Sequence, residues 1–285
     1  MSDPRLSLPA GMVEAETKVR PAAVIAFTEG PAADADGTVY FSDIINSRIM
    51  KLAPDGQLSV FRADSGRANG NLFDHQGRLL TCEGAEMGPG GRRRVVRTDL
   101  RTGEVTVLAE RFEGKRFNSP NDLAVDSRGR IYFTDPRYGD RSDLELDVEA
   151  VYRIDPDGSV TRLLAQPEIQ RPNGIAITAD DKHLYLVDSN SEAGGNRKIW
   201  AFDLRDDGSL AKQRVVYDFA PGRGADGMRV DVEGNLWIAA GINNPRRAGE
   251  TGDYPAGVYV VTPAGKCLYK ARINVSGWTV YPALE

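Results

Sequence analysis

The sequence predicts an all-β fold, a β-propeller, and three observations carry this prediction. Short runs rich in β-branched and aromatic residues alternate with tight Gly turns along the chain. Between these runs we find no apolar spacing typical of an amphipathic helix. The pattern repeats with a period of about 40 to 50 residues, which is typical of four-stranded propeller blades. Two β-sandwich domains are the alternative, but sandwiches would not require the repeats to resemble one another.

Length and charge fit one soluble domain. We expect a single domain over residues 1–285, with residues 1–20 as a lead-in. The net charge of -5 argues against a nucleic-acid partner. The one dense basic cluster, Arg92–Arg94, is expected to be a solvated hairpin.

Cysteine usage and the N-terminus indicate the compartment. Cys82 and Cys267 match neither a zinc-ligand spacing nor a disulfide framework, which favours a reducing environment. The first nine residues lack the apolar core of a signal peptide, and no later run reaches the length of a membrane span. We therefore expect a cytoplasmic protein without a membrane partner, or a periplasmic or secreted one if a leader has been removed.

The first two repeats are read from their Gly turns. After the lead-in, residues 22–27 are expected to form a strand, and the first repeat opens at Glu29-Gly30-Pro31. Three further strands follow, at residues 38–43, 48–52 and 58–61. The second repeat opens near Asn69-Gly70 and contains a strand over residues 78–83. It then carries a Gly-rich insertion over residues 84–91.

The third repeat is the most complete. It opens with the amide-rich stretch 116–122 and forms an inner hairpin that ends at Asp135. Its outer strands are expected at residues 151–154 and 160–163. The last two repeats open at residues 171–174 and 225–227.

One polar residue recurs in every repeat, about eight or nine positions before the inner turn. The first strand of a blade lines the central channel, so such a position forms a ring around the axis. The donors are carboxylate and amide oxygens, which suit Ca²⁺ rather than Zn²⁺. The alternative is that these residues only cap turns beside Gly. The ring residues are Glu29, Asn69, Asn121, Asn173 and Asp226.

Several stretches together resemble the SMP-30/gluconolactonase/LRE-like family of six-bladed propellers, in its gluconolactonase branch. The resemblance runs from about residue 22 onward. It is carried by residues 29–31, 116–122, 133–139, 171–176 and 225–228. In that family the matching residues hold one divalent cation, commonly Ca²⁺, with Zn²⁺, Mg²⁺ or Mn²⁺ as alternatives. The resemblance implies as metal ligands Glu29, Asn121, Asn173 and Asp226.

The chain departs from the family pattern in two places. Glu83 is followed by Gly84 where many relatives have Cys-Glu-His, so we expect a remodelled pocket wall with Glu83 as a substrate contact. Residues 268–273 resemble the family's last strands, so about thirty residues of the closing blade are missing. We expect either a depleted sixth blade, completed in part by residues 22–27, or a deleted segment, because an open propeller leaves unpaired edges.

The ring and the resemblance together predict metal-dependent hydrolysis of a sugar lactone, a small-molecule substrate. A partly coordinated cation can polarise a lactone carbonyl and position water, with Asp226 as the general base. Arg116, Asn118 and Asn121 are candidate substrate contacts; for Arg116 and Asn118, loop structure is the open alternative.

Two other functions stay open at this point. One is phosphotriester hydrolysis at the same ring, and the other is a non-catalytic propeller with a structural cation. Converging carboxylates favour an enzyme over a scaffold, and the sugar-branch motifs favour the lactonase. A serine nucleophile elbow is absent from the sequence, and His75 and His183 fall at hairpin turns, so nucleophilic catalysis is not expected. The oligomeric state is left open.

Overall fold

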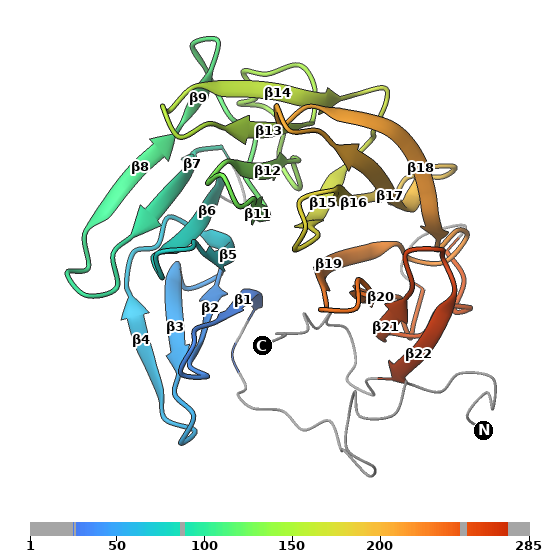
Figure 1. The fold of residues 1–285 in the computed structure, drawn as a ribbon, viewed down its shortest axis with the longest axis horizontal. Helices are drawn as coiled ribbons and strands as arrows, with labels where there is room; N and C mark the ends of the chain where they lie inside the picture. The colour runs from blue at the N-terminus through green and yellow to red at the C-terminus, as the bar shows by residue number, and fades with distance from the viewer. Residues whose placement is uncertain (1–24, 26, 86–88, 246–249, 273–285) are drawn as a thin grey trace.

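The computed structural model describes residues 25, 27–85, 89–245 and 250–272. These residues form strands, turns and loops. The strands build five four-stranded antiparallel sheets and one two-stranded hairpin within the described part of the chain. Figure 1 shows the five sheets following one another around a common centre, each with its first strand innermost. The predicted all-β propeller is therefore confirmed.

Each sheet is a meander of four consecutive strands. The first contains β1 (Thr28–Ala33), β2 (Val39–Asp43), β3 (Arg48–Leu52) and β4 (Leu58–Arg62). The second contains β5 (Ala68–Phe73), β6 (Leu79–Ala85), β7 (Gly91–Thr98) and β8 (Val105–Ala109). The third contains β11 (Leu123–Val125), β12 (Ile131–Asp135), β13 (Ala150–Ile154) and β14 (Val160–Ala165). The fourth contains β15 (Pro172–Ile177), β16 (His183–Ser189), β17 (Arg197–Leu204) and β18 (Leu210–Asp218). The fifth contains β19 (Ala225–Val230), β20 (Leu236–Ala240), β21 (Gly257–Val261) and β22 (Cys267–Arg272).

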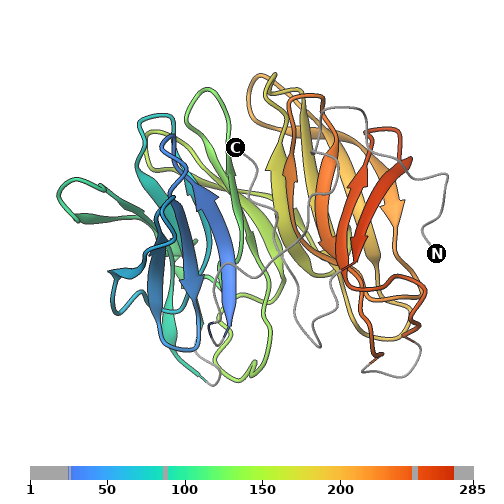
Figure 2. The same ribbon diagram turned by 90° about the horizontal axis from the view of Figure 1, so that it is seen from below.

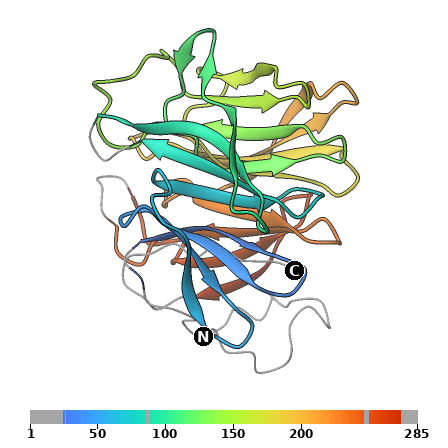
Figure 3. The ribbon, with the colours of Figure 1, turned by 90° about the vertical axis from the view of Figure 1, so that its left-hand side faces the viewer.

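A separate hairpin of β9 (Arg111–Phe112) and β10 (Lys115–Arg116) joins the second sheet to the third. Figure 1 shows it on the outer side of the ring. Seen from the side, the strands run obliquely along the central axis, and neighbouring sheets stack against one another (Figures 2 and 3). Because the strands run along the axis, residues at equal heights on successive inner strands lie around the same level of the channel.

Four of the five inner hairpins share an Asp-x-x-Gly turn, and the fourth turns at Thr178–Asp181 instead. In the second sheet, Asp74 Oδ1 accepts hydrogen bonds from the backbone N–H groups of Gln76 and Arg78, at 2.9 and 3.0 Å. Gly77 closes the turn with a φ of 71°, which side chains rarely tolerate. The same carboxylate capping recurs at Asp126 and Asp231. These turns fix the register of each inner hairpin, and with it the height of the residues at its open end.

The end of the chain corrects one expectation. Residues 268–273 were expected in a closing blade, but β22 pairs with β21 from Val261↔Cys267 to Gly257↔Arg272 and completes the fifth sheet. The reason is a tight turn in which Gly265 has a φ of 83° and the Thr262 N–H donates to the Lys266 carbonyl at 2.9 Å. This turn returns the chain directly onto β21.

The described residues contain five blades where six were expected. The expected strand over residues 22–27 falls mostly outside the described residues, as do the lead-in over residues 1–20 and any further part of a closing blade. The sixth blade, the single-domain extent and the cytoplasmic location therefore stay predictions. Nowhere in the described part does a helix occur that is long and apolar enough to cross a membrane.

Candidate functional site

The five predicted ring residues all lie at the start of inner strands. Four of them belong to β1, β5, β15 and β19, and Asn121 lies two residues before β11. In each of those four strands the pairing register is irregular at or beside the ring residue. A β-bulge redirects side chains out of the regular alternation, so it can turn one residue per blade toward the axis.

Backbone contacts place the ring residues next to one another. The glycine that follows a ring residue packs against the carbonyl of the ring residue in the next blade. A Cβ added to Gly70 would lie 2.6 Å from Asn121 O, and one added to Gly174 would lie 2.5 Å from Asp226 O. Gly30 packs against Asn69 O in the same way.

In the third blade Asn121 is followed by Asp122 instead of a glycine, and a hydrogen bond joins this blade to the fourth. The Thr134 hydroxyl donates to Asn173 O at 2.8 Å. The ring residues therefore form a row in sequence order, with carboxylates at its two ends, Glu29 and Asp226, and amides between them.

Two amide oxygens of this row accept no hydrogen bond from the residues that the structure describes. Asn121 Oδ1 and Asn173 Oδ1 are buried without a partner among the described residues, and both residues are only 6% exposed. Buried polar atoms are nearly always satisfied, so such an atom calls for an explanation. Oxygen atoms from amides and carboxylates are the ligands that Ca²⁺ prefers. The residues present therefore fit a hard divalent cation.

The carboxylates complete this donor set. Glu29 is buried, and the Asp226 side chain is largely buried, with its Oδ2 3.6 Å from Arg223 Nη2. The described ranges contain no group of three or more His, Cys, Asp or Glu side chains that could hold a metal ion. The row has the composition of a calcium site with neutral ligands rather than that of a His or Cys zinc site.

A buried ion pair crosses the inner strands beside the row. Asp122 is fully buried, and its Oδ2 lies 3.8 Å from Arg229 Nη1 of β19. Burial raises the pKa of the Asp122 carboxyl, and Arg229 opposes this rise. Arg229 Nη2 also donates to Asn71 O in β5 at 3.3 Å. The Arg229 side chain therefore connects the fifth blade with the second and third, a role that the sequence pattern did not indicate.

A group of polar side chains flanks Asn173. Asn173 Nδ2 donates to the Tyr138 hydroxyl at 2.9 Å. The Arg171 guanidinium lies 5.7 Å from the centre of the Tyr138 ring, and Arg171 Nε lies 3.5 Å from Glu149 Oε2. Tyr138 is 43% exposed, but its hydroxyl contacts the buried Asn173, and there burial and then the Asp226 carboxylate raise the pKa of Tyr138. Tyr138 and Arg171 belong to stretches that carried the family resemblance, but the sequence assigned them no role.

Two predicted substrate contacts are engaged in loop structure. The Arg116 guanidinium donates to the Gly91 carbonyl, and its backbone N–H donates to Glu145 Oε2 at 2.8 Å. Asn118 is almost fully buried, and its Nδ2 donates to Val148 O at 2.9 Å. These contacts match the loop alternative that the sequence left open, so substrate contact by either residue stays a prediction.

Glu83, the third predicted contact outside the row, is fully buried among arginines. Arg62 Nη2 lies 2.9 Å from its Oε1, and Arg94 Nε lies 2.6 Å from its Oε2. Arg62 belongs to the first blade and Arg94 to the second, so Glu83 links the two blades. The Arg92–Arg94 cluster, expected to be solvated, is instead paired: Arg93 is buried 3.5 Å from Asp143 Oδ2. Contact of Glu83 with substrate stays a prediction.

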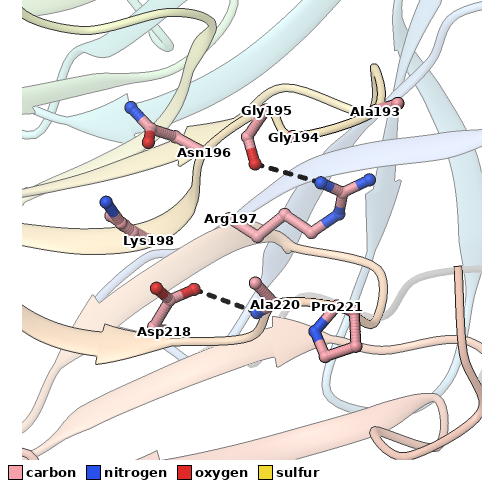
Figure 4. A pocket seen from close by; sticks show the side chains of 9 residues that line it. All are labelled: Ala193, Gly194, Gly195, Asn196, Arg197, Lys198, Asp218, Ala220 and Pro221. Carbon is pink, nitrogen blue, oxygen red and sulfur yellow. Dashed lines mark hydrogen bonds between the residues drawn. The ribbon is translucent and has the colours of Figure 1, made fainter. Parts of the chain in front are cut away.

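A separate hollow lies at the end of the fourth blade. It has a volume of about 310 Å³ and is lined by residues 193–198, Asp218, Ala220 and Pro221 (Figure 4). The buried Arg197 guanidinium donates to Gly195 O at 3.0 Å and so closes the loop that forms one wall. The predicted site residues do not line this hollow, so it is distinct from the row.

Comparisons with known proteins agree with the resemblance seen in the sequence. The family model described as the SMP-30/Gluconolactonase/LRE-like region matches residues 27–280. A gluconolactonase of Zymomonas mobilis is 32% identical over 265 residues, which cover 86% of this chain and 69% of that protein. A lactonohydrolase of Aspergillus oryzae is 29% identical and covers 61% of this chain and 41% of its own. The solved structure of a gluconolactonase from Xanthomonas campestris superposes with a TM-score of 0.72 at 33% identity, covering 88% of this chain and 78% of that one.

Proposed function

The chain belongs to the SMP-30/gluconolactonase/LRE-like family, and we propose that it hydrolyses a sugar lactone at the row of inner-strand residues with the help of one divalent cation. Its named relatives identify it as a lactone hydrolase. The observation that carries the proposed site is the pair of buried, unsatisfied oxygens, Asn121 Oδ1 and Asn173 Oδ1, in one row with two carboxylates.

Four residues would hold the cation: Glu29, Asn121, Asn173 and Asp226. A cation bound there supplies Lewis-acid chemistry, because it polarises a carbonyl and lowers the pKa of water. Ca²⁺ is the first candidate because two ligands are neutral amides and none is His or Cys.

Asp226 is the proposed general base. It takes a proton from the water that attacks the lactone carbonyl carbon, and it returns that proton to the ring oxygen as the C–O bond breaks. The product is an open-chain hydroxy acid. The Arg223 guanidinium lies 3.6 Å from Asp226 Oδ2 and keeps the Asp226 side chain oriented while Asp226 carries the proton.

The other two functions have less support. A non-catalytic propeller with a structural cation would use the same oxygen donors, but the relatives named above are a gluconolactonase and a lactonohydrolase, which favours an enzyme. Phosphotriester hydrolysis would use the same row, but the named relatives act on lactones. We therefore retain lactone hydrolysis alone.

A pH-stat assay tests the proposal. The protein is first treated with a chelator, then supplied with Ca²⁺, Mg²⁺, Mn²⁺ or Zn²⁺ and a panel of aldonolactones, and the spontaneous hydrolysis rate is subtracted. We expect metal-dependent turnover that falls about 100-fold or more in Asp226→Asn. Asp36→Asn, at an exposed turn, is the matched control and should keep full activity. Equal rates for wild type and Asp226→Asn on every lactone would refute the proposal.

A further inference from the structure

Asn173 presents a planar amide with an acceptor on one side and a donor on the other. Its two orientations exchange the positions of Oδ1 and Nδ2. In the structure Nδ2 donates to the Tyr138 hydroxyl at 2.9 Å, and Oδ1 is the buried atom without a partner. The question is what fixes this orientation, since the two ends of an amide have nearly the same shape.

One hydrogen bond to the Tyr138 hydroxyl holds the amide in the orientation that is present. The hydroxyl oxygen accepts the N–H of Asn173 Nδ2 at 2.9 Å. Because an amide is planar and carries its oxygen and its nitrogen on opposite sides, a bond that holds Nδ2 at the hydroxyl directs Oδ1 away from it.

The Tyr138 side chain is partly exposed, but its neighbours hold it in place. The Arg171 guanidinium packs over the ring, with 5.7 Å to its centre. Arg171 is fixed in turn, since its backbone N–H donates to Asp188 Oδ1 at 2.7 Å. Glu149, buried beneath Arg171, accepts a hydrogen bond from Arg141 Nη1 at 2.6 Å. The contact with Arg171 therefore holds the Tyr138 side chain in place between the third and fourth blades.

We propose that Tyr138 is a positioning residue of the cation site: its hydroxyl oxygen accepts the Asn173 amide N–H and turns Asn173 Oδ1 toward the other ring residues. The inference rests on the proposed function, because it assumes that this oxygen is a ligand. Partners that orient a metal ligand commonly contribute about 10- to 100-fold to metal affinity.

The test measures Ca²⁺ affinity by isothermal titration calorimetry on the full chain after chelation, with Ca²⁺ alone as the probe. We expect Tyr138→Phe to weaken binding about 10-fold. Tyr132→Phe is the matched control. It removes a hydroxyl that donates to Asp126 Oδ2 at 3.1 Å, at the inner turn of the third blade, and it should leave the affinity unchanged.

A second background separates positioning from a general effect on folding. A carboxylate has an oxygen on both sides, so Asn173→Asp needs no partner to choose an orientation. In the Asn173→Asp background, Tyr138→Phe should therefore change the affinity less than about twofold. An equal 10-fold loss in both backgrounds would overturn the inference, as would wild-type affinity in Tyr138→Phe. Absence of Ca²⁺ binding by the wild type would overturn the proposed cation site, and this inference with it.

Discussion

Replacing Gly174 by alanine adds one methyl group at the contact between the fourth and fifth blades. The new Cβ would lie 2.5 Å from Asp226 O, 2.9 Å from Gly227 Cα and 3.1 Å from Met228 N. Ordinary van der Waals contact begins at 3.4 Å, and the atoms in the way are backbone atoms that cannot rotate aside. The two inner strands must therefore separate by up to about 1 Å.

This displacement has two measurable costs. Overpacking of this kind destabilises folded proteins by about 1–3 kcal/mol. Because Asn173 and Asp226 lie at the moved contact, the row is distorted as well, and a shift of about 1 Å can reduce turnover about 100-fold. We expect both effects in Gly174→Ala, measured by urea unfolding followed by tryptophan fluorescence and by the lactone assay.

The control is Gly252→Ala. Neither Gly174 nor Gly252 has a φ in the left-handed region, so alanine fits the backbone at both positions. A Cβ at Gly252 would meet nothing within 4 Å among the described residues. The comparison therefore isolates the contact from the change in unfolded-state entropy that both substitutions share. If Gly174→Ala were as stable and as active as Gly252→Ala, the close packing of successive ring residues would be refuted.

Three further outcomes follow from buried charges and from the row. Glu83→Ala should destabilise the protein by about 3–5 kcal/mol, because it leaves Arg62 and Arg94 without their carboxylate. Urea unfolding measures this change in stability. A loss of substrate affinity without a loss of stability would contradict the prediction. Burial raises the pKa of Asp135 from 3.8 to about 7, so between these pH values the folded protein keeps a proton that the unfolded chain has released, and stability falls as the pH rises. Unfolding at pH 5 and pH 8 should show this slope in the wild type and a flatter one in Asp135→Asn. Ca²⁺ at about 100 times its dissociation constant should stabilise the chelated protein by about 2.7 kcal/mol, and an unchanged melting temperature would argue against the cation site.

The repeated features of the fold could be predicted from the sequence. Each blade places its ring residue at nearly the same distance from its inner turn, so register alone carries Glu29 and Asn173 to equivalent positions. The irregular register beside four of the five ring residues recurs with the same repeat.

Features formed between repeats could not be predicted in this way. Tyr138 reaches Asn173 from a loop of the preceding blade, and Arg229 reaches across to Asn71. Such contacts depend on how blades face one another, which the pattern within one blade does not encode. The pairing of β22 was misjudged for a related reason, since strands of different blades have similar patterns and only the turn at Gly265 assigns it to the fifth.

The order of the row, with acids at its ends and amides between them, bears on how the molecule resists unfolding. A chain of repeats behaves as a one-dimensional array, in which the terminal units are the weakest. Glu29 and Asp226 belong to the first and last described blades and are separated by about two hundred residues of sequence. A cation bound to both would act as a reversible cross-link that closes one very long loop, as a disulfide does in secreted proteins. Fraying of the terminal blades would then be governed by the free concentration of the ion.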